Sequence, residues 1–583
     1  MHALPDHLKK YIVDQNDQKY TPKEQAVWRY ILRQLKNYLK DHAHESYLDG
    51  LEKTGISSEE IPMIKDISKH LEKFGWRALP VSGFIPPAAF MELQSLSVLP
   101  IASEMRSIDH LKYTPAPDIV HEAAGHAPFL AHPEFAEYLK KYSTVAKKAI
   151  ISKEDLDTYE AIRVLSDLKE NPTSTAEQIS LAEKHLNAVV EQNKTVSEAA
   201  ELGRMNWWTA EYGLIGDVNQ PKIFGAGLLS SVGESKSCLE AKVKKLPLTI
   251  DCLKYTYDIT EQQPQLFVTP SFKHLEKVLF EMADRMAFRV GGASGLEKAK
   301  QARTVNTVVL NSGAQVSGIV SNYEAQNDRV DFIQFSSPTQ ICADDSQLPD
   351  HGKEYHATGF SSPIGKLKGI STCPSEMSNE QWESLGLQLS QKLVLHYESG
   401  FVVEGTYFGR TVRHDKTILM KFKDATVTKG DKIYYKPEWG PFDLLLGSTV
   451  ESVFGGPADR ISYGQNDDFV VKKVATKKLS ETEMKINQLY SDLRHMRTKF
   501  SFESAGLPTL TSIFNKMQEL DSTDWLIVLE IYEILVTRRS ALSKETGYEN
   551  FVKTIRQDLE LKKKSAKDNA DSIEHGVQLA TIQ

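Results

Sequence analysis

Hydrophobic residues recur at helical spacing through the first half of the chain. The apolar positions of TPKEQAVWRYILRQLKNYL lie three or four residues apart, at Trp28, Ile31, Leu32, Leu35 and Leu39. This spacing indicates one buried helix face. Thr21, Pro22 and Glu24 precede it and form a capping-box pattern with proline in the first turn. Residues 56–75 and 271–288 repeat the periodicity, so we expect residues 20 to about 292 to be mainly helical.

The pattern changes after RVGGASG, residues 289–295, which we interpret as a linker. Short β-branched and aromatic runs follow, with turn signals at Ser399-Gly400 and Lys429-Gly430-Asp431, and they predict a β-rich segment from 300 to about 472. From Ser480 the pattern is helical again, and the stretch after about Lys562 is a polar tail. The expected fold is multidomain: an N-terminal extension (1–19), a mainly α-helical domain (20–295), a β-rich domain (296–475) and a helical C-terminal region (476–583).

Composition narrows the class of protein. A chain of 583 residues with 40% hydrophobic and 25% charged residues suits several globular domains. The formal net charge of −8 and the lack of a basic patch argue against nucleic acid as a partner. Four cysteines without a Cys-x-x-Cys pair favour a reducing, cytoplasmic location. The N-terminus has no signal-peptide core, and the most apolar run, WLIVLEIYEILV, is too short to span a membrane.

Two histidines and a glutamate lie close together in PDIVHEAAGHAPF, residues 117–129. His121 and His126 are five residues apart, which places them about 140° apart on a straight α-helix. Gly125 and Pro128 indicate that the helix loosens or ends here, so that both imidazoles can converge on a metal. Glu211, in MNWWTAEYGLIGD, is a candidate third ligand, and two histidines with one carboxylate form the facial triad of non-haem iron(II) oxygenases. A zinc hydrolase using His121, Glu122 and His126 remains the alternative.

Several blocks of the sequence resemble one enzyme family. YTPAPDIVHEAAGHAPF, WWTAEYGLIGD, IFGAGLLSSVGE and the upstream IPMIKDISKHLEKFGWRALPVSGFIPPAAF occur together and in order. They resemble the pterin-dependent aromatic amino acid hydroxylases over residues 20 to 292. The resemblance implies an iron(II) monooxygenase that uses a tetrahydropterin and O₂ to hydroxylate the ring of a free aromatic amino acid. Phenylalanine is the favoured substrate, with tyrosine and tryptophan as alternatives.

The resemblance also implies three groups of site residues. The catalytic iron(II) ligands are His121, His126 and Glu211. The substrate-binding residues are Arg106, Thr114, Ser230, Trp207 and Tyr113. The pterin-binding residues are Gly83, Phe84, Ile85, Phe90 and Glu122. Within these groups, Arg106 would grip the substrate carboxylate with its two-pronged guanidinium, and Phe90 would stack on the pterin ring. Asp118 would orient His121.

The chain departs from the family in two places. Pro86-Pro87-Ala88-Ala89 replaces the family's polar link after the pterin loop. Residues of about 145–200, between His126 and Glu211, form a longer, charged segment that predicts two surface helices inserted into the domain.

The second half offers no catalytic constellation by pattern alone. His396, Tyr397 and His414 are scattered through the β runs, where packing or surface roles are expected. We therefore interpret residues 296–583 as a binding or assembly module through which the chain could associate with itself. The expected partners are a small-molecule substrate and a second copy, with no nucleic acid and no membrane.

Overall fold

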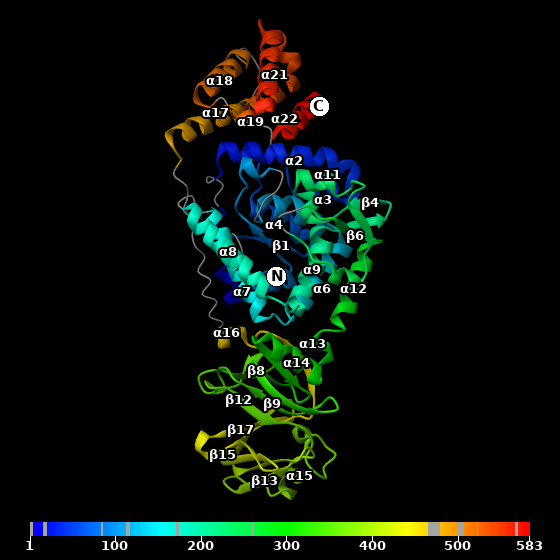
Figure 1. Cartoon of the computed structure of the whole chain (residues 1–583), viewed down its shortest axis with the longest axis vertical. Helices are drawn as coiled ribbons and strands as arrows, with labels where there is room; N and C mark the ends of the chain where they lie inside the picture. The colour runs from blue at the N-terminus through cyan, green and yellow to red at the C-terminus, as the bar shows by residue number, and fades with distance from the viewer. Residues whose placement is uncertain are drawn as a thin grey trace.

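The chain forms an elongated molecule with three groups of elements (Figure 1). The computed structural model describes residues 4–15, 20–82, 85–111, 117–170, 174–258, 262–464, 479–498, 506–521, 523–565 and 569–582. The first half of the chain forms the middle of the molecule, the β strands of residues 305–455 form one end, and the C-terminal helices form the other.

The middle of the molecule is mainly helical, with a two-stranded and a four-stranded sheet. Its elements before the loop at residue 150 are α1 (Asp6–Lys9), α2 (Pro22–His42), α3 (Ser46–Lys53), α4 (Ile64–Leu71), η2 (Glu72–Phe74), β1 (Arg77–Val81), α5 (Pro87–Ser95), β2 (Val98–Ala102), η3 (Ile108–His110), η4 (Val120–His126), η5 (Ala127–Ala131) and α6 (Pro133–Ala146). Its later elements are α7 (Lys153–Glu170), α8 (Ala176–Gln192), α9 (Glu198–Asn206), η6 (Trp207–Glu211), β3 (Leu214–Asp217), β4 (Gln220–Ile223), α10 (Ala226–Leu229), α11 (Val232–Ser237), β5 (Lys244–Pro247), η7 (Ile250–Lys254), β6 (Gln265–Thr269) and α12 (Phe272–Ala283). Helices α13 (Ala287–Val290) and α14 (Gly292–Ala302) follow and pack on the strands of the β-rich end.

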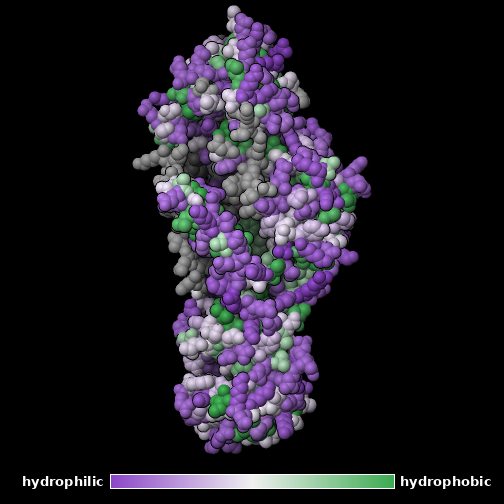
Figure 2. Space-filling view, viewed as in Figure 1, coloured by the Kyte–Doolittle hydropathy of each residue, from purple (hydrophilic) through white to green (hydrophobic). Residues whose placement is uncertain are grey.

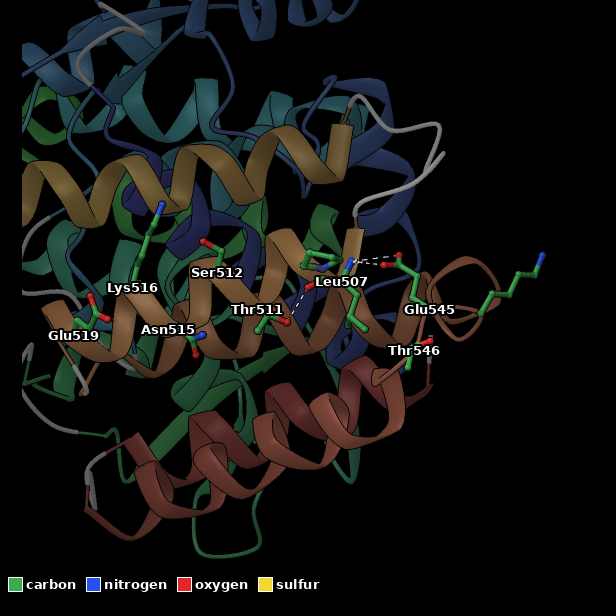
Figure 3. Close-up of a pocket in the computed structure, with 10 residues that line it drawn as sticks. Leu507, Thr511, Ser512, Asn515, Lys516, Glu519, Glu545 and Thr546 are labelled. Atoms are coloured by element: carbon green, nitrogen blue, oxygen red, sulfur yellow. Dashed lines mark hydrogen bonds between the residues drawn. The ribbon is translucent and has the colours of Figure 1, made fainter.

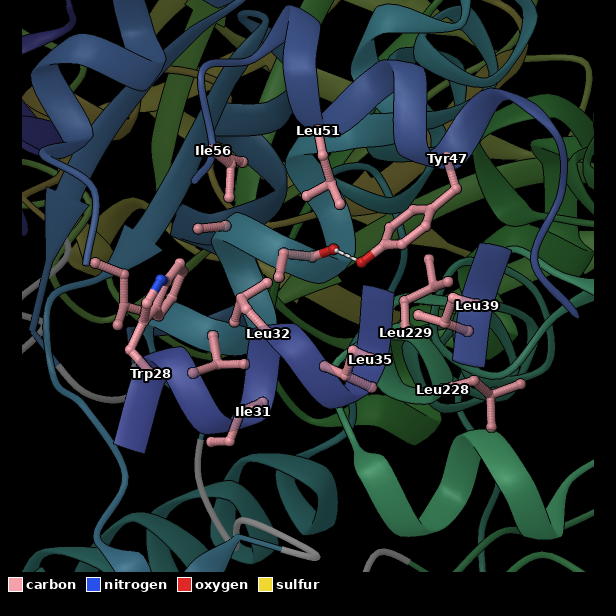
Figure 4. Packing of buried hydrophobic residues seen from close by; sticks show 14 of the residues in the cluster. Trp28, Ile31, Leu32, Leu35, Leu39, Tyr47, Leu51, Ile56, Leu228 and Leu229 are labelled. Atoms are coloured by element: carbon pink, nitrogen blue, oxygen red, sulfur yellow. Dashed lines mark hydrogen bonds between the residues drawn. The ribbon is translucent and has the colours of Figure 1, made fainter. Parts of the chain in front are cut away.

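Helix α2 begins as its sequence predicts. The Thr21 hydroxyl accepts the Glu24 backbone N–H, and the Glu24 carboxylate accepts that of Thr21, so the capping box is complete. Its apolar face packs on residues of α3, the following loop and α10 (Figure 4). In this core the Tyr47 hydroxyl donates to the Ala124 carbonyl at 2.9 Å and so ties α3 to η4.

The β-rich end consists of two antiparallel sheets. The first, seven-stranded sheet contains β7 (Val305–Leu310), β8 (Ala314–Gln326), β9 (Arg329–Phe335), β10 (Gln340–Ala343), β11 (Ser346–Gln347), β12 (Phe360–Pro363) and β18 (Val450–Gly455). The second, five-stranded sheet contains β13 (Lys392–His396), β14 (Phe401–Arg413), β15 (Lys416–Lys429), β16 (Lys432–Tyr435) and β17 (Phe442–Leu445). Short helices η8 (Pro374–Glu376), α15 (Asn379–Ser384), η9 (Pro437–Trp439) and α16 (Arg460–Tyr463) complete this part. The expected hairpin turns are present, with Gly400 and Gly430 at positive φ.

The C-terminal helices pack on α2, far from the β strands that precede them in the sequence (Figure 1). They are α17 (Glu481–Thr498), α18 (Gly506–Leu520), α19 (Trp525–Thr537), α20 (Arg539–Leu542), α21 (Tyr548–Ser565) and α22 (Ala570–Ile582). The apolar run of α19 is buried, and its Glu530 accepts two hydrogen bonds of 2.9 Å from the buried Arg29 guanidinium of α2. Arg33 of α2 likewise reaches Glu533 at 2.7 Å.

Two segments that the sequence predicted to lie outside regular structure are helical. RVGGASG is not a linker, because its residues belong to α13 and α14, which meet at Gly291. Gly291 has a φ of 53°, and a Cβ there would lie 2.5 Å from the Glu451 carbonyl oxygen, so this turn packs directly against β18. The polar tail after Lys562 contains α22, whose Ile573 and Ala580 are buried against the core, because a few apolar residues suffice to dock a short helix.

The visible face of the molecule is mostly polar (Figure 2). Figure 2 shows a face on which hydrophilic residues dominate and hydrophobic ones occur in small groups. Among the described residues, no helix combines the length and apolar character that crossing a membrane requires.

Candidate metal centre

The two histidines lie on a π-helical segment. Val120–His126 forms η4, in which the Ala127 backbone N–H donates to the Glu122 carbonyl five residues earlier. This i→i+5 bonding brings residues five apart onto one face, unlike an α-helix. His121 and His126 therefore converge, with their Nε2 atoms 3.2 Å apart. The expected loosening of the helix is a change to π geometry, followed by the 3₁₀ segment η5.

Glu211 comes from a second π segment. In η6 (Trp207–Glu211) the Tyr212 N–H donates to the Trp207 carbonyl at 2.8 Å, again an i→i+5 bond. The Glu211 carboxylate lies 3.2 Å from His121 Nε2 and 3.3 Å from His126 Nε2. The structure thus brings His121, His126 and Glu211 into one cluster with metal-ligand spacing. Single-turn π segments are frequent at functional sites.

Close backbone packing holds the two π segments together. A Cβ on Gly125 would lie 2.7 Å from the Ala226 carbonyl oxygen of α10, and one on Gly225 would lie 2.4 Å from the Glu211 carbonyl oxygen. Both positions therefore require glycine, because any side chain would separate the segments.

Ser230 contacts the metal cluster through His121. Its Oγ lies 3.1 Å from His121 Nδ1 and donates to the Ala226 carbonyl at 2.7 Å. Since the hydroxyl proton is used there, the oxygen accepts the Nδ1 proton, which leaves the Nε2 lone pair free for a metal. Ser230 is thus placed to fix the tautomer of His121.

Arg106 and Asp118 form a buried ion pair beside the cluster. Arg106 Nε and Nη2 donate to the two Asp118 oxygens, each at 2.7 Å, and Nη1 donates to the Ser230 carbonyl at 3.1 Å. The pKa of the Asp118 carboxyl, which burial alone would raise, is held below its usual value by this guanidinium. Asp118 also accepts the His121 backbone N–H at 3.0 Å and so holds the first turn of η4 in place.

The remaining predicted site residues divide into four groups. Glu122 is buried, its Oε2 has no protein partner, and burial raises its pKa to about 8. Ile85 is buried and Phe90 is half-buried, and both pack in the small cluster around Leu8, Tyr11 and Val81. Trp207 is stacked between Tyr212 and Tyr257, with ring centroids 4.4 and 4.3 Å away. Outside the described residues lie Gly83, Phe84, Tyr113 and Thr114.

Sequence reasoning missed Asn206, whose amide donates to Glu211 Oε1 at 3.2 Å. Its only signal is its position five residues before Glu211, the same step that separates the two histidines. Burial would raise the Glu211 pKa, but the adjacent imidazoles hold it well below its usual value, so the carboxylate is charged.

A separate hollow lies in the C-terminal helices. Figure 3 shows it between α18 and the turn at 544–546, where polar side chains predominate and Glu545 accepts the Leu507 N–H. Its lining includes no histidine or cysteine and no member of the metal cluster.

Comparisons with known proteins agree on a family for the first half of the chain. Residues 10–156 and 186–325 match the family described as biopterin-dependent aromatic amino acid hydroxylase, and the unmatched stretch falls within the expected insertion. The chain is 32% identical to phenylalanine-4-hydroxylase of Mesorhizobium japonicum over 46% of its own length and 82% of that protein. It is 28% identical to the Pseudomonas aeruginosa phenylalanine-4-hydroxylase over 50% of its length and 98% of that protein.

A solved structure of Chromobacterium violaceum phenylalanine hydroxylase, with bound iron(III) and 7,8-dihydrobiopterin, is similar with 24% identity and a TM-score of 0.38. It covers 48% of this chain and 92% of the solved chain. Together, the family match and the identity to the Mesorhizobium relative establish that this chain belongs to the biopterin-dependent aromatic amino acid hydroxylases.

Proposed function

We propose that the chain is an iron(II)- and tetrahydropterin-dependent monooxygenase that converts free L-phenylalanine to L-tyrosine, with O₂ as co-substrate. The observation that carries the proposal is the convergence of His121, His126 and Glu211 from two π segments. The relatives named phenylalanine-4-hydroxylase favour phenylalanine over tyrosine or tryptophan as the substrate.

The three residues fit an iron ion. Their ligand atoms lie 3.2 to 3.3 Å apart, so one ion can contact all three on one face. Two imidazoles and a carboxylate suit iron(II) and leave its other positions open. The iron and the pterin together supply the activation of O₂. Ser230 and Asn206 orient the ligands, and the charged carboxylate of Glu211 balances the metal.

The cofactor side of the site rests on Glu122 and Phe90. The buried, unpartnered Oε2 of Glu122 suits a ligand that brings N–H donors, and a pterin ring carries them. Phe90 offers an aromatic face at the edge of its cluster. Its helix α5 begins at Pro87, within the stretch that departs from the family pattern.

Arg106 is positioned for the substrate carboxylate. Three of its five side-chain N–H groups donate to Asp118 and Ser230, which leaves one on each terminal nitrogen for a ligand. A guanidinium fixed in this way has lost its rotamer freedom before the substrate binds, so binding costs less entropy. Trp207, fixed between two tyrosines, would line the ring pocket.

We further infer a division of labour along the chain. Residues 20–295 carry the reaction, with the insertion of about 145–200 on their surface, while residues 296–475 and 476–583 are accessory. Self-association is assigned to this second half, and the acidic net charge of −8 argues against a nucleic acid partner.

An aerobic assay with ferrous iron and tetrahydropterin tests the proposal, with the three aromatic amino acids supplied separately. We expect tyrosine to form from phenylalanine, with kcat/KM about 10- to 100-fold above those of the other two substrates, because a pocket distinguishes similar rings by about 1–3 kcal/mol. Preferred hydroxylation of tryptophan or tyrosine would reassign the substrate. Iron-loaded protein that hydroxylates none of the three would refute the function, and metal-dependent hydrolysis without O₂ would favour the zinc alternative.

A further inference from the structure

A second cluster of metal-ligand type lies in the β-rich end. His351, His356 and Asp443 are 1%, 8% and 4% exposed, respectively. His351 Nδ1 lies 3.2 Å from His356 Nε2, and the Asp443 Oδ2 atom lies 4.0 and 3.9 Å from these two nitrogens. It is one of two such groups among the described residues; the other is His121, His126 and Glu211, the hydroxylase triad of the proposed function. It lies beyond residue 325, where the family match ends.

The three atoms surround a space of ionic size. A point equidistant from them lies about 2.2 Å from each, close to the 2.0–2.2 Å at which zinc binds imidazole nitrogen and carboxylate oxygen. A slight contraction would complete three bonds. The arrangement therefore needs no rearrangement of the backbone to hold a metal.

Unpartnered atoms indicate that the cluster is incomplete without a ligand. Asp443 Oδ1 and His351 Nε2 are buried and have no hydrogen-bond partner. A hydrogen bond between the two imidazoles accounts for the 3.2 Å contact, but it leaves Asp443 Oδ1 without a hydrogen-bond partner. Tyr355 and Lys421 lie near this carboxylate, and a bound cation would supply the missing contact.

The backbone holds both histidines in place. The Ile341 N–H donates to the His351 carbonyl at 3.0 Å, and the Thr339 N–H donates to the His356 carbonyl at 3.1 Å. These bonds fix the loop between β11 and β12 to β10 and to the residue just before β10. Asp443 belongs to β17 of the other sheet. The cluster therefore lies where the two sheets meet.

Charge favours a transition metal over a hard cation. Two of the three facing ligand atoms are imidazole nitrogens, His351 Nδ1 and His356 Nε2, and imidazole is a ligand that transition metals prefer. Lys421, opposite Asp443 on β15, adds a positive charge near all three groups. With the carboxylate offset by this ammonium, surplus negative charge cannot attract calcium or magnesium, and imidazole donors select zinc or a related ion.

We propose that His351, His356 and Asp443 bind a second divalent transition-metal ion, independent of the hydroxylase triad. The ion ties the loop of residues 348–359 to β17 and so clamps the two sheets together. Its role is structural, because all three ligands are buried. The fourth coordination position is left to water or to the hydroxyl of Tyr355, which interacts with Asp443.

Metal stoichiometry of the full-length protein tests the proposal. The protein is stripped with a chelator, loaded with zinc, dialysed and analysed by elemental mass spectrometry. We expect two equivalents in the unsubstituted chain, one in His126→Ala, and one in Asp443→Asn, with none in the double variant. Because His126→Ala empties only the hydroxylase triad, the outcome at Asp443 does not depend on the proposed function.

His414→Gln is the matched control. His414 pairs with Asp344 at 2.8 Å in the same part of the chain, but both side chains are exposed. We expect this variant to keep both equivalents. Asp443→Asn preserves shape, and the conservative His356→Asn guards against misfolding in any one variant.

Two further measurements decide the matter. In His126→Ala protein, zinc should raise the thermal unfolding midpoint by about 5 °C or more, and Asp443→Asn should abolish the rise. Zinc X-ray absorption of His126→Ala protein should show a nitrogen and oxygen shell with two imidazoles. No zinc equivalent in His126→Ala protein, or an equivalent there that survives both Asp443→Asn and His356→Asn, would overturn the proposal.

Discussion

The two His-His-carboxylate clusters use the same donors but differ in their surroundings. In both, the histidines are five residues apart and the carboxylate comes from a distant element. In the hydroxylase triad the side chains of His121 and Glu211 are 17% and 18% exposed, whereas those of His351 and Asp443 are each only 2% exposed. The second histidines are closer in exposure, with His126 at 4% and His356 at 8%, so the difference lies mainly in the carboxylate and the first histidine of each cluster.

The neighbouring residues differ as well. Beside the first triad are Arg106, with donors left for a carboxylate, and Glu122, with an unpartnered oxygen. Around the second are strands and the backbone bonds that hold the loop in place. Donor type and spacing therefore indicate a metal, but open coordination positions and nearby binding groups decide whether the metal does chemistry.

Removal of one histidine from each triad should separate the two roles most strongly. In His126→Ala we expect iron to fall to background and hydroxylation to drop at least about 100-fold, because loss of a ligand exceeds the 10–100-fold effect of an outer-shell change. In His356→Ala the iron equivalent should remain, and His356→Ala added to His126→Ala should abolish the zinc-dependent rise in the thermal midpoint. Iron analysis, turnover and calorimetry measure these effects. Normal iron and turnover in His126→Ala would show that the first triad is not the catalytic centre.

Arg106→Lys should show that the first triad serves a carboxylate-bearing substrate. Lysine keeps the charge but loses the planar fork, so phenylalanine should bind about 30- to 150-fold more weakly, or about 2–3 kcal/mol. Titration calorimetry of the iron-loaded protein measures this. Arg29→Lys is the control, because Arg29 is also a buried arginine paired with a carboxylate, Glu530, but belongs to the α2–α19 contact. It should lower stability without changing phenylalanine affinity, and equal affinity losses in both variants would assign Arg106 a structural role.

Ser230→Ala tests how the histidines are held in each cluster. In the first triad a hydroxyl contacts the His121 ring, whereas in the second cluster backbone hydrogen bonds hold the loop that carries both histidines. Loss of the contact with His121 Nδ1 should weaken iron binding about tenfold. Competition with a chelator measures the affinity, and Ser230→Thr should restore it. Ser231→Ala is the neighbouring control, since Ser231 caps α11 through the Glu234 N–H. An unchanged iron affinity in Ser230→Ala would remove Ser230 from the metal site.

Phe90→Ala should give the smallest effect and sharpen the cofactor side of the comparison. A lost stacking contact of about 1 kcal/mol predicts a rise in the apparent pterin KM of about fivefold to tenfold. Steady-state kinetics with varied pterin measure it, and Phe90→Tyr should behave like the unsubstituted chain. A change confined to the phenylalanine KM would move the pterin site elsewhere.

The sequence pattern predicted those features that depend on residues close together in the chain. The α2 helix, its capping box and the loosened helix at His121 follow from residues a few positions apart. The hairpin turns at Gly400 and Gly430 follow for the same reason. Glu211 was found only as a candidate, because its distance from the histidines is set by tertiary packing.

Contacts between residues far apart in the chain could not be predicted from the sequence pattern. Arg106 pairs with Asp118 across a loop, and nothing in either residue's surroundings shows the partner. His351 lies in the loop between β11 and β12 and Asp443 on β17, so they meet only in the fold, while the histidines that pattern drew attention to, His396 and His414, are not in the cluster. RVGGASG looked like a linker because glycine-rich runs favour turns, yet its glycines permit two helices to meet against β18.

The contact between α2 and α19 has a consequence for synthesis on the ribosome. Arg29 emerges early, but Glu530, which neutralises it, follows about 500 residues later. At about 5–20 residues per second, the face of α2 that carries Arg29 and Arg33 stays uncovered for about 25–100 s. During that interval the nascent hydroxylase domain exposes a surface to which chaperones can bind. A chain released from a ribosome that stalls within the β-rich segment would lack the C-terminal helices that cover α2.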